Sequence, residues 1–163
     1  MKAAIPRSLL MLVCILIVSA AQAQLKGFSI GPYVEGVWPT GGFENTHKRG
    51  IGAGVGADLK LPARLGLSAS IGYLHIPGDR IEGGKAETIN AVPLRAGIKY
   101  RFTGMYLKLE SGVAKHMNQG VAPVIIAPGM GVRVLGLDIQ GKFETWIKSD
   151  TWSFWGLKAS YQF

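Results

Sequence analysis

The feature that most constrains this chain is an alternation of apolar and polar residues with a period of two, which begins near Phe28 and continues to the C-terminus. A period of two is typical of β-strands, because successive side chains point to opposite faces of a sheet. The segments run mostly about 10 to 12 residues, longer than the roughly 5 or 6 of a soluble strand and close to the roughly 9 to 11 that a tilted transmembrane strand needs. The predicted strands are 27–38, 50–60, 65–76, 89–102, 105–117, 124–135, 137–146 and 153–163.

The connections between these segments alternate strictly between short and long. The short ones are 61–64, 103–104 and Gly136, and the long ones are 39–49, 77–88, "NQGVAP" and "IKSDT". Outer-membrane barrels have short periplasmic turns, longer outside loops and an even number of antiparallel strands. The sequence therefore predicts an all-β fold, an eight-stranded antiparallel up-and-down transmembrane β-barrel with both chain ends at the side of the short turns.

The N-terminus has the three-part layout of a secretory signal peptide. Lys2 and Arg7 precede an apolar run over 9–18, and small residues follow up to Ala23. We expect cleavage after Ala23, which gives a signal peptide over 1–23 and a barrel domain over 24–163. Cleavage removes Cys14, the single cysteine, and lowers the net charge from +8 to +6. The remaining positive charges are spread along the chain, so we expect no nucleic-acid partner.

The two faces of the predicted strands differ sharply in composition. In 50–60 one face carries Ile51, Val55 and Leu59, while the other carries Gly52 and Asp58. The same alternation would fit a soluble lipocalin-like barrel with the apolar face inward. Small residues on the charged face and aromatic residues at the strand ends favour the membrane barrel, whose charged face is the interior.

The interior of an eight-stranded barrel is just wide enough for side chains to fill it, so charges there have to pair. We therefore predict a luminal network of ion pairs that plugs the barrel. Its excess of cations predicts bound anions or water near the rims. The predicted network consists of Glu35, Asp58, Lys60, Arg95, Lys99, Arg101, Lys108, Glu110, Arg133, Asp138, Lys142, Glu144 and Lys158.

Three segments carry a family resemblance: "GVWPTGGF" (36–43), "INAVPLRAGIKYRF" (89–102) and the terminal "ASYQF". They resemble the small outer-membrane β-barrel domain family of Gram-negative bacteria, especially Bacteroidota, with an OmpA/OmpX-like eight-stranded architecture. The resemblance implies export across the inner membrane and a location in the outer membrane. It also implies that Phe163, with Tyr161 two residues before it, is the signal read by the barrel-insertion machinery.

Residues that could carry chemistry are few. His47, His75 and His116 all fall on the side of the long loops, and their spacing supports no metal site, so we expect solvated rim histidines. Ser111 lies in the middle of a strand, far from His75, which disfavours nucleophilic catalysis. We therefore expect no enzyme, no metal and no cofactor.

The hypothesis that follows is an integral outer-membrane protein with a side-chain-filled lumen and a structural or surface-interaction role. Its partners would be outer-membrane lipid, the insertion machinery and an extracellular ligand that contacts loops 39–49 and 77–88. Two alternatives stay open at this stage: a narrow porin-like channel for small solutes, and a soluble periplasmic lipocalin-like binder.

Overall fold

The computed structural model describes residues 27–81, 84–116, 122–148 and 151–163. The predicted signal peptide over 1–23 lies outside the described residues. In the described part of the chain, helices of the length and apolar character required to span a membrane are absent.

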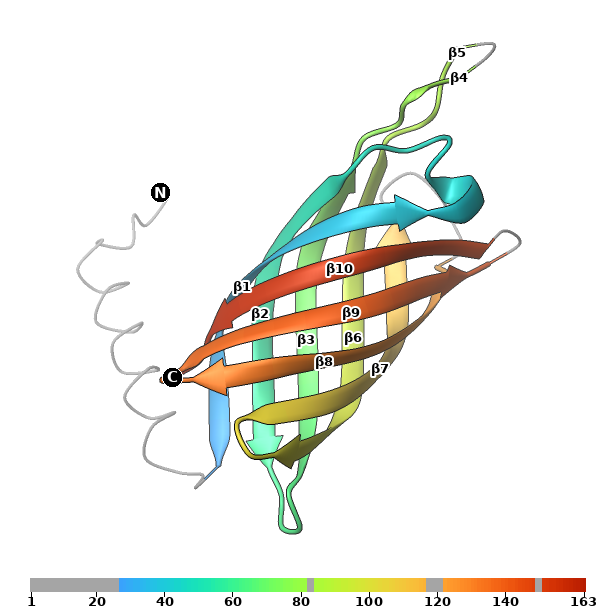
Figure 1. Ribbon diagram of the computed structural model, residues 1–163. Coiled ribbons are helices and arrows are strands. Elements are labelled where there is room, and N and C mark those ends of the chain that lie inside the picture. Colours follow the sequence, from blue (N-terminus) through green and yellow to red (C-terminus); the bar gives the residue numbers. More distant parts are fainter. Residues whose placement is uncertain (1–26, 82–83, 117–121, 149–150) are drawn as a thin grey trace, which may run out of the picture.

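Eight long strands form a closed barrel in which every neighbouring pair is antiparallel (Figure 1). The strands follow one another around the barrel in chain order, and the first and last close it, with Tyr33 opposite Ser160 and Thr40 opposite Ser153. The predicted fold class is confirmed. The barrel strands are β1 (Phe28–Thr40), β2 (Gly50–Lys60), β3 (Leu65–Ile76), β6 (Ile89–Phe102), β7 (Met105–His116), β8 (Val124–Val134), β9 (Leu137–Ile147) and β10 (Thr151–Tyr161).

Three predicted strands, 50–60, 65–76 and 89–102, have the observed bounds, and the other five shift by one or two residues at one or both ends. Three short elements in the loops were not predicted. They are the 3-10 helix η1 (Gly41–Phe43) and the two-residue strands β4 (Arg80–Ile81) and β5 (Gly84–Lys85), which pair with each other. In Figure 1 this small hairpin extends beyond the barrel.

The connections divide the barrel into two ends (Figure 1). The turn end carries the connections 61–64, 103–104 and 135–136, together with the start of β1 and the end of β10. The loop end carries the longer connection 41–49 and the segments 77–81 and 84–88.

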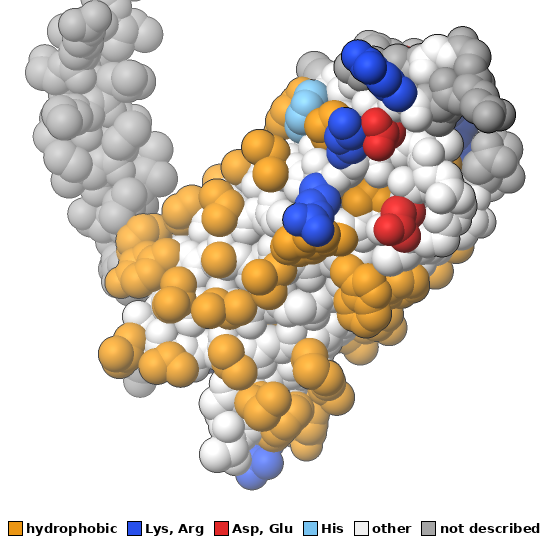
Figure 2. All heavy atoms as spheres, turned by 45° about the horizontal axis from the view of Figure 1, so that its top comes forward, with side chains coloured by type: hydrophobic (Ala, Val, Ile, Leu, Met, Phe, Trp, Pro, Cys, Tyr) orange, Lys and Arg blue, Asp and Glu red, His pale blue; other side chains and the backbone are white. Residues whose placement is uncertain are grey.

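The outer wall of the barrel is apolar. Val34, Ile51 and Ile98 expose 61%, 71% and 58% of their surface, whereas Arg95 and Glu110 on the opposite face are buried. Figure 2 shows hydrophobic side chains over the barrel wall and charged side chains gathered mainly toward the loop end. A soluble barrel has the reverse arrangement, since its apolar face fills the core and its charged face meets water. The lipocalin-like alternative therefore does not fit this structure.

The lumen has two layers along its axis, and only one of them was predicted. The half nearer the loop end is filled by an apolar plug that comes from the loop-end portions of the strands and from η1. The charged side chains fill the remainder, from the middle of the barrel to the turn end. The apolar plug comprises Val37, Phe43, Leu74, Ile76, Ile89, Ala91, Ala114, Ile125, Ala127, Trp146 and Phe154.

Candidate functional site

The candidate functional site is the lumen with its two ends. Its middle holds a central ion cluster of Glu35, Arg95, Lys142 and Glu144, contributed by β1, β6 and β9. The Arg95 guanidinium lies 2.9 Å from Glu144 and 3.2 Å from Glu35, and the Lys142 ammonium lies 2.6 Å from Glu144 and 2.7 Å from Glu35. The indole N–H of Trp146 donates to Glu144 Oε1 at 2.6 Å. All four charged side chains are fully buried, so this pairing is what makes their burial tolerable.

A second group, the turn-end ion cluster, joins Asp58, Lys99, Arg133 and Asp138. The Lys99 ammonium lies 2.8 Å from Asp58 and 3.6 Å from Asp138, and the Arg133 guanidinium pairs with both carboxylates. The Tyr106 hydroxyl donates to Asp138 Oδ1 at 2.5 Å. Two cations thus face two anions here, as in the central ion cluster.

The remaining buried charges lie between these clusters. The Lys108 ammonium is 2.9 Å from Glu110, which also accepts a hydrogen bond from Gln140 at 3.2 Å. Lys158 lies over the Tyr33 ring, with its ammonium 3.8 Å from the ring centroid. A cation over an aromatic face is attracted by the ring quadrupole, which compensates part of the cost of burying Lys158.

Glycines opposite these long side chains give them room. A Cβ atom on Gly72 would lie 2.2 Å from the Tyr33 hydroxyl, and one on Gly131 would lie 2.4 Å from the Tyr106 hydroxyl. The rings of Tyr33 and Tyr106 can therefore lie against the inner wall only because these positions carry no side chain. Beside the turn-end ion cluster, a void lined by Asp58, Lys99 and Asp138 measures about 10 Å³, no more than the space of a single water molecule.

Two residues of the predicted network lie outside it. Lys60 is exposed, and Arg101 donates through its guanidinium to the carbonyl of Leu65 instead of pairing with a carboxylate. Both sit at the turn end, where the barrel opens. Both line a cavity of about 420 Å³ at this mouth.

The apolar plug was not predicted, because the inward face of the strands was expected to carry charged or small residues throughout. The sequence pattern does place aromatic residues on the inward face. Trp146 has the same parity as the inward Glu144, and Phe154 has the opposite parity to the outward Trp155. His116 shares this inward parity and is only 6% exposed. Its ring packs edge-on against Trp146 and Trp152, so the expectation of a solvated histidine is wrong there.

The other two histidines are partly buried. His75 Nδ1 is 2.7 Å from Asn90 Oδ1, which also accepts from the Tyr73 hydroxyl. His47 packs against Phe43, and burial lowers the pKa of its imidazole below the usual value. No three His, Cys, Asp or Glu side chains come together to hold a metal in the described ranges.

The loop-end segments are fastened to each other. The amide of Lys48 donates to Pro77 O at 2.9 Å, and the amide of Asp79 donates to Thr46 O at 2.8 Å. An ion pair of 3.3 Å joins Lys48 to Asp79, and the backbone amide of Arg80 lowers the pKa of the Asp79 carboxyl. His47 Nε2 lies 3.1 Å from the carbonyl of Glu87. Residues 46–48, 77–81 and 84–87 therefore form one connected surface.

Tyr161 and Phe163 lie together on the lipid-facing surface at the turn end. Their rings are 5.2 Å apart, and they expose 49% and 60% of their surface. The amide of Phe163 donates to Ile30 O at 3.1 Å, which fastens the last residue to β1. Their role as an insertion signal stays a prediction.

Comparison with known proteins places the fold. No known family profile and no curated protein sequence matches the chain. The structure of the outer-membrane protein Ail of Yersinia pestis in a phospholipid bilayer nanodisc matches with a TM-score of 0.57 and 15% identity, over 85% of this chain and 100% of Ail. The crystal structure of Ail matches with a TM-score of 0.52 and 16% identity, over 84% of this chain and 97% of Ail.

The chain has the fold of a small outer-membrane β-barrel. The structural match to Ail, at this level of identity, confirms the predicted resemblance in fold. The exposed apolar wall and the buried charged lumen are the arrangement that this fold has in a membrane.

Proposed function

We propose that this chain is an integral outer-membrane protein of a Gram-negative bacterium, closed to solutes, that presents its loop end as a contact surface for an extracellular ligand. The observation that carries the proposal is the filled lumen inside an apolar wall. The central ion cluster is fully buried, and the apolar plug closes the lumen beyond it.

A porin-like channel would need a continuous polar path, and among the described residues the apolar plug interrupts such a path. The void beside the turn-end ion cluster is about 10 Å³, and Trp146 and Phe154 in the plug are almost fully buried. Porins with an aqueous channel have about 16 to 18 strands, whereas eight strands enclose only enough space for side chains.

The surface formed by residues 46–48, 77–81 and 84–87 supports the contact role. A surface whose hydrogen bonds and ion pair already exist loses little conformational entropy when a partner binds. Ail, which has the same fold, is named the attachment invasion locus protein, so this fold carries a surface role in another protein.

Orientation is tested with single cysteines in cells that express the protein. Gly42→Cys at the loop end should react with a membrane-impermeant maleimide in intact cells. Leu135→Cys at the turn end, where Leu135 is 93% exposed, should react only after the outer membrane is permeabilised. Labelling of Leu135→Cys in intact cells, with Gly42→Cys protected, would contradict the proposal.

The contact role needs its own experiment. Protein in nanodiscs is exposed to an array of purified extracellular polysaccharides and proteins, beside a variant in which residues 80–87 are replaced by a Gly-Ser segment of equal length. We expect binding that the replacement abolishes. A Thr103→Ser change in the turn-end connection is the control and should leave binding unchanged. Absence of binding, or binding that survives the replacement, would overturn the contact role.

A further inference from the structure

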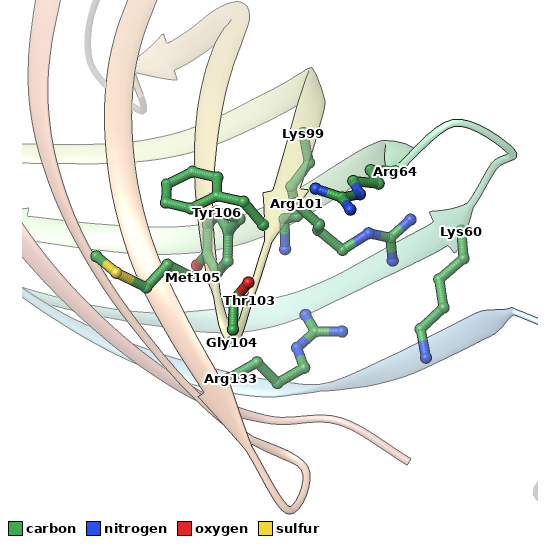
Figure 3. A pocket seen from close by; sticks show the side chains of 10 residues that line it. Lys60, Arg64, Lys99, Arg101, Thr103, Gly104, Met105, Tyr106 and Arg133 are labelled. Carbon is green, nitrogen blue, oxygen red and sulfur yellow. The ribbon is translucent and has the colours of Figure 1, made fainter.

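The cavity at the turn end, here called the basic mouth, is lined by five cationic side chains: Lys60, Arg64, Lys99, Arg101 and Arg133. They come from β2, β6, β8 and the turn between β2 and β3, and Figure 3 shows them around the same space. Among the described residues, no carboxylate lines this cavity of about 420 Å³. The basic mouth therefore has the size and sign of an anion site.

Only part of this positive charge is compensated within the protein. Lys99 and Arg133 pair with the carboxylates of the turn-end ion cluster. In the part of the chain that the structure describes, no carboxylate lies within ion-pair distance of Lys60, Arg64 or Arg101. An excess of three positive charges thus remains on the rim of the basic mouth.

The turn that carries Arg64 holds it in an unusual backbone conformation. The amide of Leu65 donates to Pro62 O at 3.2 Å, and the two central residues, Ala63 and Arg64, have φ of 55° and 64°. Such two-residue turns favour Asn-Gly, because side chains other than those of Asn, Asp and Gly are disfavoured at positive φ. The Arg101 amide donates to Arg64 O at 2.9 Å and fastens the turn to β6. This strained backbone is fixed beside Arg101, and strain of this kind is concentrated at binding sites.

The basic mouth lies at the level of lipid headgroups. Its wall includes Met105, which also belongs to the lipid-facing surface with an exposure of 43%. At the same end, Tyr100, Tyr161 and Phe163 expose their rings on the outer wall. Aromatic residues form girdles at the interface between the apolar membrane core and the headgroups.

We infer that the basic mouth binds a phosphate-bearing anion. Guanidinium groups present planar, paired N–H donors that match phosphate oxygens, and Arg64 and Arg101 place two such groups beside the ammonium of Lys60. The phosphate belongs either to the headgroup of an anionic phospholipid at the edge of the barrel or to a soluble phosphate compound. This site is separate from the loop-end contact surface of the proposed function.

The test compares three proteins: the wild type, an Arg64→Gln/Arg101→Gln variant, and an Arg49→Gln/Arg80→Gln variant that loses the same charge at the loop end. Inorganic phosphate is titrated onto each protein in a zwitterionic detergent, and binding is followed by NMR shifts of the amides at 60–61, 63–64 and 99–104. In a second arm, native mass spectrometry measures how much phosphatidylglycerol each protein retains from nanodiscs that also contain phosphatidylcholine.

We expect binding by the mouth variant to be at least about tenfold weaker, since charge-assisted hydrogen bonds are lost, and the loop-end variant to behave as the wild type. Weakening in both arms identifies a lipid headgroup, and weakening with inorganic phosphate alone identifies a soluble phosphate compound. Equal binding by all three proteins, or no binding by the wild type, overturns the inference. If the double variant does not fold, Lys60→Gln, whose side chain is exposed at the rim, should weaken the same binding.

Discussion

Replacement of Glu144 by glutamine tests whether the central ion cluster holds the lumen closed. Glu144 accepts from Arg95 at 2.9 and 3.2 Å and from Trp146 at 2.6 Å, and its second oxygen is 2.6 Å from the Lys142 ammonium. Glutamine keeps one acceptor oxygen but turns an N–H₂ group toward Lys142. The cluster then has two cations and one carboxylate in a fully buried site.

Removal of one partner from a buried ion pair costs about 3 to 5 kcal/mol, because the other charge stays buried without compensation. We therefore expect Glu144→Gln to lower the free energy of unfolding by about that amount. Lys142→Met in the same chain removes the surplus cation and should restore more than half of the loss. Unfolding in urea is followed in lipid vesicles by tryptophan fluorescence and by the mobility of the unheated protein on gels.

The exposed pair Lys48–Asp79 is the control for this double-mutant cycle. Its side chains are 62% and 40% exposed, so Lys48→Gln and Asp79→Asn should show a much smaller coupling. A Glu144→Gln protein as stable as the wild type would refute the reasoning. So would a coupling between Glu144 and Lys142 no larger than that of the control pair.

Three further predictions address the glycine wall, the loop end and assembly. Gly72→Ala should destabilise the barrel by about 1 to 3 kcal/mol, because the new Cβ meets the Tyr33 hydroxyl. Urea unfolding of the Gly72→Ala/Tyr33→Leu protein should recover part of the lost stability. Gly42→Ala is the control and should be neutral, since Gly42 has open space around it. The attachment of residues 46–48 should weaken as pH falls below about 6.5. Burial lowers the pKa of His47 in the attached state, so the imidazole takes up a proton more readily once the segment is released. Amide exchange in this segment should therefore speed up as pH is lowered from about 7.5 to about 5, and His47→Gln should remove this pH dependence. Deletion of Phe163 should impair assembly in the outer membrane, measured by the heat-modifiable fraction, more than it impairs export. Phe163→Tyr keeps a terminal aromatic residue and should assemble normally. Normal assembly of the shortened chain would contradict the role of Phe163 as an insertion signal.

The strands and their faces could be predicted because both depend on local pattern. The period of two assigns Ile51 outward and Asp58 inward without knowledge of the neighbouring strands. The alternation of short and long connections then orders the strands around the barrel. Closure between β1 and β10 follows, because an open edge would leave backbone groups unpaired in lipid.

The choice of partners within the lumen could not be predicted in the same way. Arg95 pairs with Glu35 and Glu144, which are 60 and 49 residues away, across a lumen whose stagger is fixed only when the barrel closes. The sequence gives the inventory of charges but not which charges meet. Lys60 and Arg101 were expected among the paired charges because their side chains have inward parity. They lie close to the rim, however, so they line the open mouth of the barrel and not a buried ion pair.

The loop end was the least predictable part. Its fastening depends on backbone bonds such as Lys48 to Pro77, which carry no side-chain pattern. The short strands β4 and β5 pair only two residues each, too few for an alternation to be recognised. The burial of His116 was accessible from parity, but its packing against Trp152 depends on where β10 begins.

The measurement that tests the central claim most directly is ion conductance across a planar bilayer that contains the purified protein, with heat-modifiable migration of the same sample as proof of the folded state. A lumen filled by the apolar plug and the ion clusters predicts a membrane without steady current. Reproducible unitary currents from the folded protein would contradict the closed lumen and favour a channel.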